Sequence, residues 1–311
     1  MKIVFILLSV VLLFCSLGCS DKEVNIADLP SDGTAFQKML IAQLSGNSSI
    51  ASVDGEELFL NSRWNSHEKQ LTRAYLKAVI RKLSLIPIEH SYQVPNLLPV
   101  VDVLIEPLRG KNIYTVLPAT EKKNEYVIIG AHYDTGGKNV PGAIDNGSGM
   151  ALIFEILRKV KMLKDRRKNL MVVFFDQEED DISAGSTAFA AYLNSSDLNV
   201  HSVHTFDLIG WDGDHNREIE IELPNEDIER RYRKHASELN IPIYVSTVNS
   251  SDHYSFIQQG INAVGISQAY AKGDNSGKKD TPEDKFHFVN FEYLKTSTQL
   301  AFHVIKEIIN Y

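Results

Sequence analysis

Apolar positions along the chain repeat with two different periods. Apolar side chains recur at helical spacing over residues 68–84, which predicts an amphipathic helix. Later segments contain continuous apolar runs, of the kind found in strands that are buried on both faces, whereas polar and apolar residues alternate over 218–223. The chain is therefore expected to form strands at residues 125–129, 169–175, 203–208, 218–223 and 263–266, and further helices at 147–162, 186–193, 226–239 and from about 291. Because strands alternate with helices, we predict an α/β fold with a mostly parallel central sheet, flanked by helices on both faces.

The amino terminus has the pattern of an export signal. Lys2 precedes an apolar run over residues 3–14, which is too short to span a bilayer as a mature helix and is typical of a secretory signal peptide. The stretch SLGC, which ends at Cys19, resembles a bacterial lipobox, in which cleavage precedes a cysteine that becomes lipid-modified. Ser16 departs from this pattern because an aliphatic residue is usual there. The alternative is a soluble exported protein that is cut nearby.

These features divide the chain into three expected parts. Residues 1–18 form a signal peptide, residues 19–31 a polar tether, and residues 32–311 a single folded domain. We expect the protein to be exported and held at the cell envelope, meeting the membrane through lipidated Cys19 only. The other cysteine, Cys15, also lies at the end of the signal. The domain therefore has no cysteine that could act as a nucleophile or a zinc ligand.

The composition is that of an ordinary globular protein, with 43% hydrophobic and 23% charged residues in a chain of 311. The 40 acidic residues outnumber the 32 basic residues, which gives a net charge of −8. Nucleic-acid binding that is independent of sequence needs a basic footprint. We therefore expect no nucleic acid among the partners.

Polar residues follow the predicted strands at the points where the strands end. In a parallel sheet these carboxyl ends meet at one edge, and ligand sites lie beyond that edge. The residues expected there are His132 and Asp134 after the first strand, Asp176, Glu178 and Glu179 after the second, Asp207 after the third, and Asp145 in a glycine-rich turn between the first two. A histidine with carboxylates is how proteins hold zinc or a similar divalent metal. The pattern therefore predicts a metal site.

Each of these pieces has a simpler interpretation by itself. A single histidine at a strand end is more often structural, and the acidic run at residues 178–181 could be a solvated turn. The glycine-rich turn could cradle a phosphate at a helix N-terminus, but it lacks a P-loop lysine and Asp145 would repel the phosphate. Neighbouring carboxylates are costly unless a positive charge compensates them. No basic residue adjoins the acidic run in the sequence, so a bound metal is the favoured source of that charge.

Six motifs occur in the order GAHYD, PGAIDNGSG, FFDQEE, FDLIG, SSDHYSF and DTPEDK. Together they resemble the M28 family of zinc aminopeptidases, over residues 60–310. The resemblance implies a co-catalytic metallopeptidase with a zinc-exopeptidase-like fold and two divalent metal ions, zinc foremost. It assigns His132, Asp145 and Asp207 to one metal, Asp145 and Glu179 to the second metal, Glu178 as general base, and Asp134 as the residue that accepts a hydrogen bond from His132 and fixes its tautomer.

One position departs from the family pattern. The family's last metal ligand is a histidine near the carboxyl terminus, and Asp280 stands at the matching position of this chain. An aspartate can still ligate a divalent metal through oxygen, so we expect Asp280 to complete the second metal position. Otherwise that position would be incomplete, or His253 or His287 would fill it.

The resemblance implies hydrolysis of the N-terminal peptide bond of peptides by a water that two metal ions activate. Glu178 would accept the proton of this water and return it to the leaving amine. The expected substrates are peptides with a free N-terminus, since a free α-amine suits an acidic site. Two alternatives remain open, a glutaminyl-cyclase-like acyltransferase on the same fold and a catalytically inactive binding domain. The oligomeric state is not predicted.

The lipobox generates a prediction about location. Cys19→Ser should move the protein from detergent-extracted membranes to the soluble fraction without lowering its activity, because the cysteine has no part in the expected chemistry. Membrane fractionation with immunoblotting measures this. Equal membrane association of both forms would show that the lipobox interpretation is wrong.

Overall fold

A computed structural model describes residues 24–53, 56–94, 108–180 and 183–311. The predicted signal peptide and Cys19 lie outside these residues. Among the helices of the described part, none is long and apolar enough to cross a membrane. Val24 and Ile26, near the middle of the predicted tether, are buried against the core, so this part of the chain packs on the domain.

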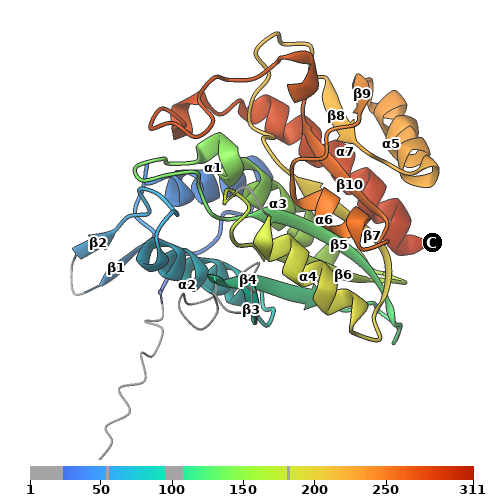
Figure 1. Cartoon of the computed structure of the whole chain (residues 1–311), viewed down its shortest axis with the longest axis horizontal. Coiled ribbons are helices and arrows are strands. Elements are labelled where there is room, and N and C mark those ends of the chain that lie inside the picture. Colours follow the sequence, from blue (N-terminus) through green and yellow to red (C-terminus); the bar gives the residue numbers. More distant parts are fainter. Residues whose placement is uncertain (1–23, 54–55, 95–107, 181–182) are drawn as a thin grey trace, which may run out of the picture.

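Eight strands form one mixed sheet in the order β3-β4-β6-β5-β7-β10-β8-β9, shown in Figure 1. These strands are β3 (Ile88–Val94), β4 (Leu108–Leu117), β5 (Glu125–His132), β6 (Asn169–Phe175), β7 (Asn199–Phe206), β8 (Ile219–Glu222), β9 (Ile243–Ser246) and β10 (Ala263–Gln268). The neighbours β6, β5, β7 and β10 run parallel, and β9 is parallel to β8. The pairs β3–β4, β4–β6 and β8–β10 are antiparallel. Separately, β1 (Ala51–Val53) and β2 (Glu56–Leu58) pair with each other.

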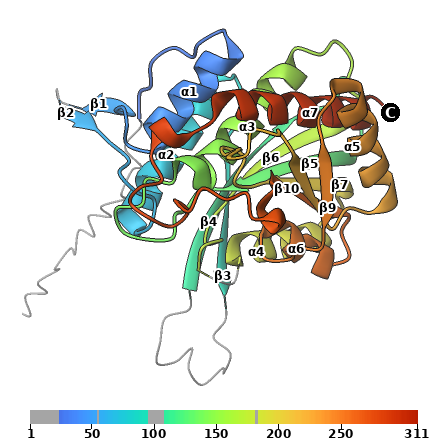
Figure 2. The same cartoon turned by 90° about the horizontal axis from the view of Figure 1, so that it is seen from above.

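Helices cover both faces of the sheet, as Figure 2 shows. Five helices pack on one face: α1 (Gly33–Leu44), α2 (Ser66–Lys82), α3 (Gly149–Lys161), α5 (Glu226–Leu239) and α7 (Phe291–Asn310). The other face carries α4 (Ala184–Asn194) and α6 (Asp252–Gln258). Short helical turns lie at Ala143–Ser148, Tyr270–Lys272 and Phe286–Phe288. The predicted α/β fold, with a mostly parallel central sheet flanked by helices, is confirmed.

The sequence explains why the central strands are buried. Every residue of β6 is inaccessible to solvent, as expected of an apolar strand that helices cover on both faces. Helix α2 begins with a capping box, in which Asn65 and Glu68 satisfy each other's backbone N–H groups. This fixes the entry of α2 beside β4. The amphipathic helix predicted over residues 68–84 is therefore confirmed, with its boundaries shifted by two residues.

The alternating strand predicted at residues 218–223 is β8, and both of its faces are buried. Glu220 and Glu222 are buried because the protein itself supplies hydrogen-bond donors. The backbone N–H of Ala271 donates to Glu220 at 2.7 Å, and the Ser267 hydroxyl donates to Glu222 at 2.8 Å. Burial also raises the pKa of Glu222 to about 8. Alternation of polar residues therefore does not imply a solvent-exposed face here.

The parallel strands β5, β6 and β7 end at the same edge of the sheet. His132 is the last residue of β5, and Asp207 immediately follows β7. Strand β6 ends at Phe175, next to β5, and leads into the acidic turn. The fold therefore brings the side chains predicted at the strand ends to one place.

Candidate metal centre

Three carboxylates surround the ring of His132 at this edge. His132 Nε2 lies 3.1 Å from Asp145 Oδ1 and 3.4 Å from Asp207 Oδ1. One ligand atom each from His132, Asp145 and Glu179 lies within 4.8 Å of the other two. Both His132 and Asp145 are buried, with side chains only 1% exposed. Histidine with carboxylates in this arrangement is a donor set for zinc or a similar divalent ion.

The hydrogen bonding of the cluster also fits a cation. Asp145 Oδ1 and Glu179 Oε1 are buried, and no donor hydrogen-bonds to either atom. A buried carboxylate oxygen without a donor is costly, and a divalent ion would remove this cost by coordination. The described residues therefore fit a metal, and the ligand assignment remains a prediction.

Asp134 links the end of β5 to the turn after β6. Its Oδ1 lies 3.5 Å from His132 Nδ1. It also accepts the backbone N–H groups of Glu178, at 3.2 Å, and Glu179, at 3.3 Å. Asp134 therefore holds the two glutamates in register with the end of β5 and faces the His132 ring. No hydrogen bond to His132 Nδ1 forms at 3.5 Å, so the role of fixing the tautomer stays a prediction.

The turn that carries Asp145 is fixed by a residue of the DTPEDK motif. Asp284 is buried and accepts the backbone N–H groups of Ile144 and Asp145, at 2.8 and 2.9 Å. Burial raises the pKa of Asp284 to about 7, although these two hydrogen bonds oppose the shift. The sequence included Asp284 in a motif without giving it a role. In the structure it positions the central carboxylate of the site.

A buried arginine holds the other side of the same turn. Arg63 is fully buried and donates to the backbone carbonyls of Leu44, Tyr133, Pro141 and Gly142, at 2.6 to 2.9 Å. Gly142 has a φ of +62°, and a Cβ atom there would lie 2.4 Å from the guanidinium. Burial lowers the pKa of Arg63 to about 10, so the side chain stays charged. The sequence gave no signal for Arg63, because it precedes the predicted helix in a segment without a motif.

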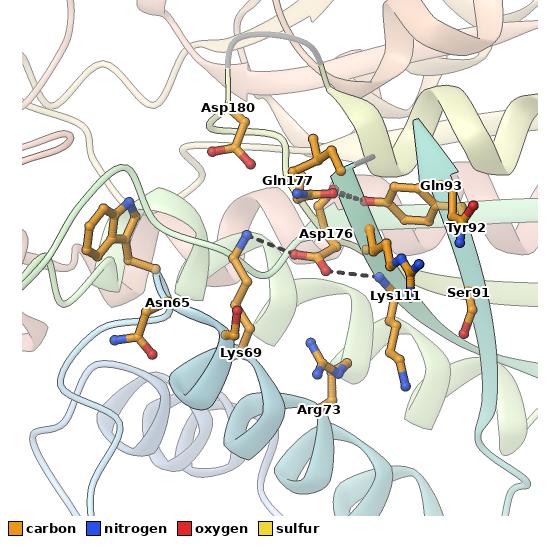
Figure 3. Close-up of a pocket in the computed structure, with 15 residues that line it drawn as sticks. Asn65, Lys69, Arg73, Ser91, Tyr92, Gln93, Lys111, Asp176, Gln177 and Asp180 are labelled. Atoms are coloured by element: carbon orange, nitrogen blue, oxygen red, sulfur yellow. Dashed lines mark hydrogen bonds and ion pairs between the residues drawn. The ribbon is translucent and has the colours of Figure 1, made fainter. Parts of the chain in front are cut away.

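A lysine of α2 forms an ion pair with Asp134. Lys69 Nζ, from α2, lies 3.0 Å from Asp176 Oδ1 and 3.7 Å from Asp134 Oδ2. Figure 3 shows Lys69 and Asp176 pointing toward one another, with Lys111 donating its backbone N–H to Asp176. These residues line a cavity of about 840 Å³, on the side of the turn occupied by Asp176 and Gln177. The carboxylates identified as metal ligands do not line it.

The glutamates of the site are strongly perturbed. Burial raises the pKa of Glu178 well above its usual value, and the charges of Asp207 and Asp252 add to this shift. Burial and the charge of Asp145 raise the pKa of Glu179 to about 10. Burial would lower the pKa of His132, but the surrounding carboxylates, Asp207 foremost, raise it well above its usual value. The carboxylates therefore dominate the electrostatics of the site.

Asp280 lies beside Glu179, at the predicted second metal position, and both line the same cavity. Burial raises the pKa of Asp280. Neither alternative histidine approaches the cluster. His253 is turned toward the Val248 carbonyl at 2.9 Å, and His287 is exposed, with its ring tilted against that of Phe288.

A second cavity, of about 450 Å³, opens directly from the cluster. Glu178, Glu179, Lys279 and Asp280 form its inner wall. The remaining lining is polar: Ser183, Thr187, Asn249, Ser250, Ser251, Tyr254, Ser255 and Gln258. Ser251 also donates to Asp207 at 3.2 Å, which connects this wall with the predicted ligands.

Comparisons with known proteins agree with this architecture. The sequence model of peptidase family M28 matches residues 112–305. A "Probable leucine aminopeptidase" from Trichophyton verrucosum is 26% identical over 217 residues, which cover 63% of this chain and 57% of that protein. The chain thus spans less than two thirds of this relative's length.

Two solved structures show the same fold. A zinc aminopeptidase from Bacillus subtilis matches with a TM-score of 0.73 at 15% identity, over 91% of this chain and 97% of that chain. A glutaminyl cyclase from Porphyromonas gingivalis matches with a TM-score of 0.69 at 17% identity, over 91% of this chain and all of that chain.

The fold and the donor set define an α/β domain with a divalent-metal site at the carboxyl edge of its sheet. The chain belongs to peptidase family M28, since the family match covers more than half of it. This match includes His132, Asp145, Glu179 and Asp207. The membership predicted from the six motifs is confirmed.

The buried arginine generates a stability prediction. Arg63→Met should lower the free energy of unfolding by at least about 3 kcal/mol, because four buried carbonyls lose a charged donor. Chemical denaturation of the metal-free protein measures this. Arg233→Met is the matched control, since Arg233 is half exposed and contacts Glu229 at the surface. A loss at Arg63 no larger than at Arg233 would show that the guanidinium does not hold the turn.

Proposed function

We propose that the protein is a metal-dependent aminopeptidase that removes the N-terminal residue of peptides. The observation that carries this proposal is the convergence of His132, Asp145 and Glu179 beside Glu178, in a domain of peptidase family M28. Similar proteins whose names describe aminopeptidases also support the proposal.

We further propose two metal positions that share Asp145. Zinc would bind His132, Asp145 and Asp207 at the first position, and a second divalent ion would bind Asp145, Glu179 and Asp280. When bound, such ions polarise the scissile carbonyl and lower the pKa of a water molecule. The lipobox likewise supports an exported protein that is anchored at the cell envelope through Cys19.

The chain's own residues would then divide the remaining work. Glu178 accepts a proton from the attacking water and returns it to the departing amine. Asp134 holds the backbone of Glu178 and faces the His132 ring, so the base and the ligand share one anchor. The carboxylates that line the 450 Å³ cavity attract the positively charged α-amine of the substrate.

The polar cavity beside the cluster indicates the chemical class of the N-terminal side chain. Its lining offers hydroxyl and amide groups, including a Thr187–Ser255 hydrogen bond of 2.9 Å. An apolar side chain would remove water from these groups and leave them without partners. We therefore propose that polar N-terminal residues are preferred.

A panel of aminoacyl anilides on the zinc-loaded protein tests the function and this preference together. In the near-isosteric pairs Thr against Val and Asn against Leu, kcat/KM should be higher for the polar member by at least about tenfold. Cleavage that favours Val and Leu would overturn the preference alone. A complete lack of hydrolysis would overturn the aminopeptidase proposal. Loss of ammonia from a peptide with N-terminal glutamine, in place of hydrolysis, would indicate a cyclase.

Replacing the proposed base provides a second prediction. Glu178→Gln should keep the fold and the metal content but lower kcat by at least about a hundredfold, because an amide cannot accept the water's proton. Steady-state kinetics and elemental analysis of the same sample measure this. Asp180→Asn is the control, since it removes one exposed negative charge from the same turn. Near-normal kcat in the Glu178 variant would remove this residue from its role.

A further inference from the structure

A lysine reaches into the proposed metal centre from the loop that carries Asp280. Lys279 Nζ lies 3.3 Å from Asp145 Oδ2, the second oxygen of the carboxylate that both metal positions would share. The Lys279 side chain is only 34% exposed and lines the inner wall of the 450 Å³ cavity. An aminopeptidase assignment alone does not account for a cation at this position.

The surroundings of Lys279 are almost entirely negative. The charge of Asp145 has the largest effect on its pKa, and Asp207, Glu179 and Glu178 also act to raise it far above its usual value. A lysine ammonium group is protonated at neutral pH, and these carboxylates favour its charged form. It supplies positive charge at the place where a second divalent ion would supply it.

Lys69, a second lysine near the site, forms ion pairs with different carboxylates. Lys69 pairs with Asp176 and Asp134, on the far side of the His132 ring. Among the ion pairs of the described residues, Lys279 provides the lysine contact to Asp145. Its neighbour Asp280 packs closely on Gly136, where a Cβ atom would lie 2.3 Å from Asp280 Oδ1. This close packing fixes the loop from which Lys279 reaches the cluster.

We propose that Lys279 competes with a divalent ion for Asp145, so that the second metal position binds weakly and exchangeably while the first binds tightly. For a second ion to reach Asp145 and Glu179, the ammonium group must leave Oδ2, because two cations cannot share that oxygen without strong repulsion. The first position uses Oδ1, near His132 Nε2, and does not require this displacement. The inference rests on the metal centre of the proposed function.

The test is a titration of metal-free protein with Zn²⁺ and Mn²⁺ by calorimetry, with the bound metal counted by elemental analysis. Wild type should retain about one ion after dialysis. Lys279→Met should tighten the second binding step by at least about tenfold and leave the first step unchanged. Lys279→Arg keeps a cation and should keep the second step weak.

Lys278→Met is the matched control, because it removes the same charge from the adjacent residue. Lys278 lies over the ring of Phe288, with its Nζ 4.7 Å from the ring centroid, and contacts none of the predicted ligands. Tightening of less than tenfold in Lys279→Met, or equal tightening in Lys278→Met, would overturn the proposal.

A measurement on wild type covers the case in which Lys279→Met fails to fold without metal. Reductive methylation followed by peptide mass spectrometry reports how accessible each lysine amine is. Lys279 should become several-fold more reactive when Mn²⁺ is raised to saturate the second step, while Lys278 stays constant. An unchanged rate at Lys279 would overturn the competition.

These outcomes are separate from failure of the proposed function. If the first ion binds and aminoacyl anilides are cleaved, but Lys279→Met changes nothing, only the competition is wrong. If wild type binds no ion tightly and cleaves no substrate, the metallopeptidase proposal itself fails.

Discussion

Repulsion among buried carboxylates is the constraint on which this site depends. Glu178, Glu179, Asp145 and Asp207 meet at one sheet edge. Burial there raises the energy of the charged forms of Glu178, Glu179 and Asp145. The protein satisfies some acidic groups with its own donors. Asp134 and Asp284 receive backbone N–H groups, whereas Asp145 and Glu179 keep oxygen atoms without donors. This difference separates carboxylates that build the site from those available to a ligand.

The turn that presents Asp145 is held by groups that are not themselves predicted ligands. Arg63 donates to the carbonyls of Pro141 and Gly142, which precede Asp145 in the chain. The backbone N–H groups of Ile144 and Asp145 then donate to Asp284. A metal or catalytic site works only if its side chains keep their positions. In this chain that rigidity comes from one buried cation and one buried anion on opposite sides of a single turn, together with the sheet beneath them.

The sequence predicted the central part of the fold because its strands are apolar throughout and its helices are amphipathic. It missed α1, α6, the strands β3, β4 and β9, and the β1–β2 pair. The burial patterns of β3 and β4 mix exposed and buried positions, so no single period stands out in these two strands. The ligand candidates could be predicted since they follow strands directly. Arg63 and Lys69 could not, because only the tertiary fold brings them to the site.

The structure also changes how the acidic turn is understood. From the sequence, no basic residue adjoined residues 178–181, and a bound metal was the favoured compensation. In space, Lys69 pairs with Asp176 and Asp134, and Lys279 lies beside Asp145. Part of the compensation therefore comes from the protein, although Glu179 remains without a partner at one oxygen. The proposed metal would satisfy that atom, but it has less charge to compensate than the sequence alone implied.

Asp280 and Lys279 have to be interpreted as a pair. Where a neutral histidine is expected from the family pattern, Asp280 adds one negative charge, which alone would make the centre less electrophilic. Lys279 contributes one positive charge within the same cluster, which offsets the charge of Asp280. The two charges lie at different places, because Lys279 contacts Asp145 and Asp280 lies beside Glu179. At the carboxylate that two metal ions would share, this chain therefore presents a cation of its own.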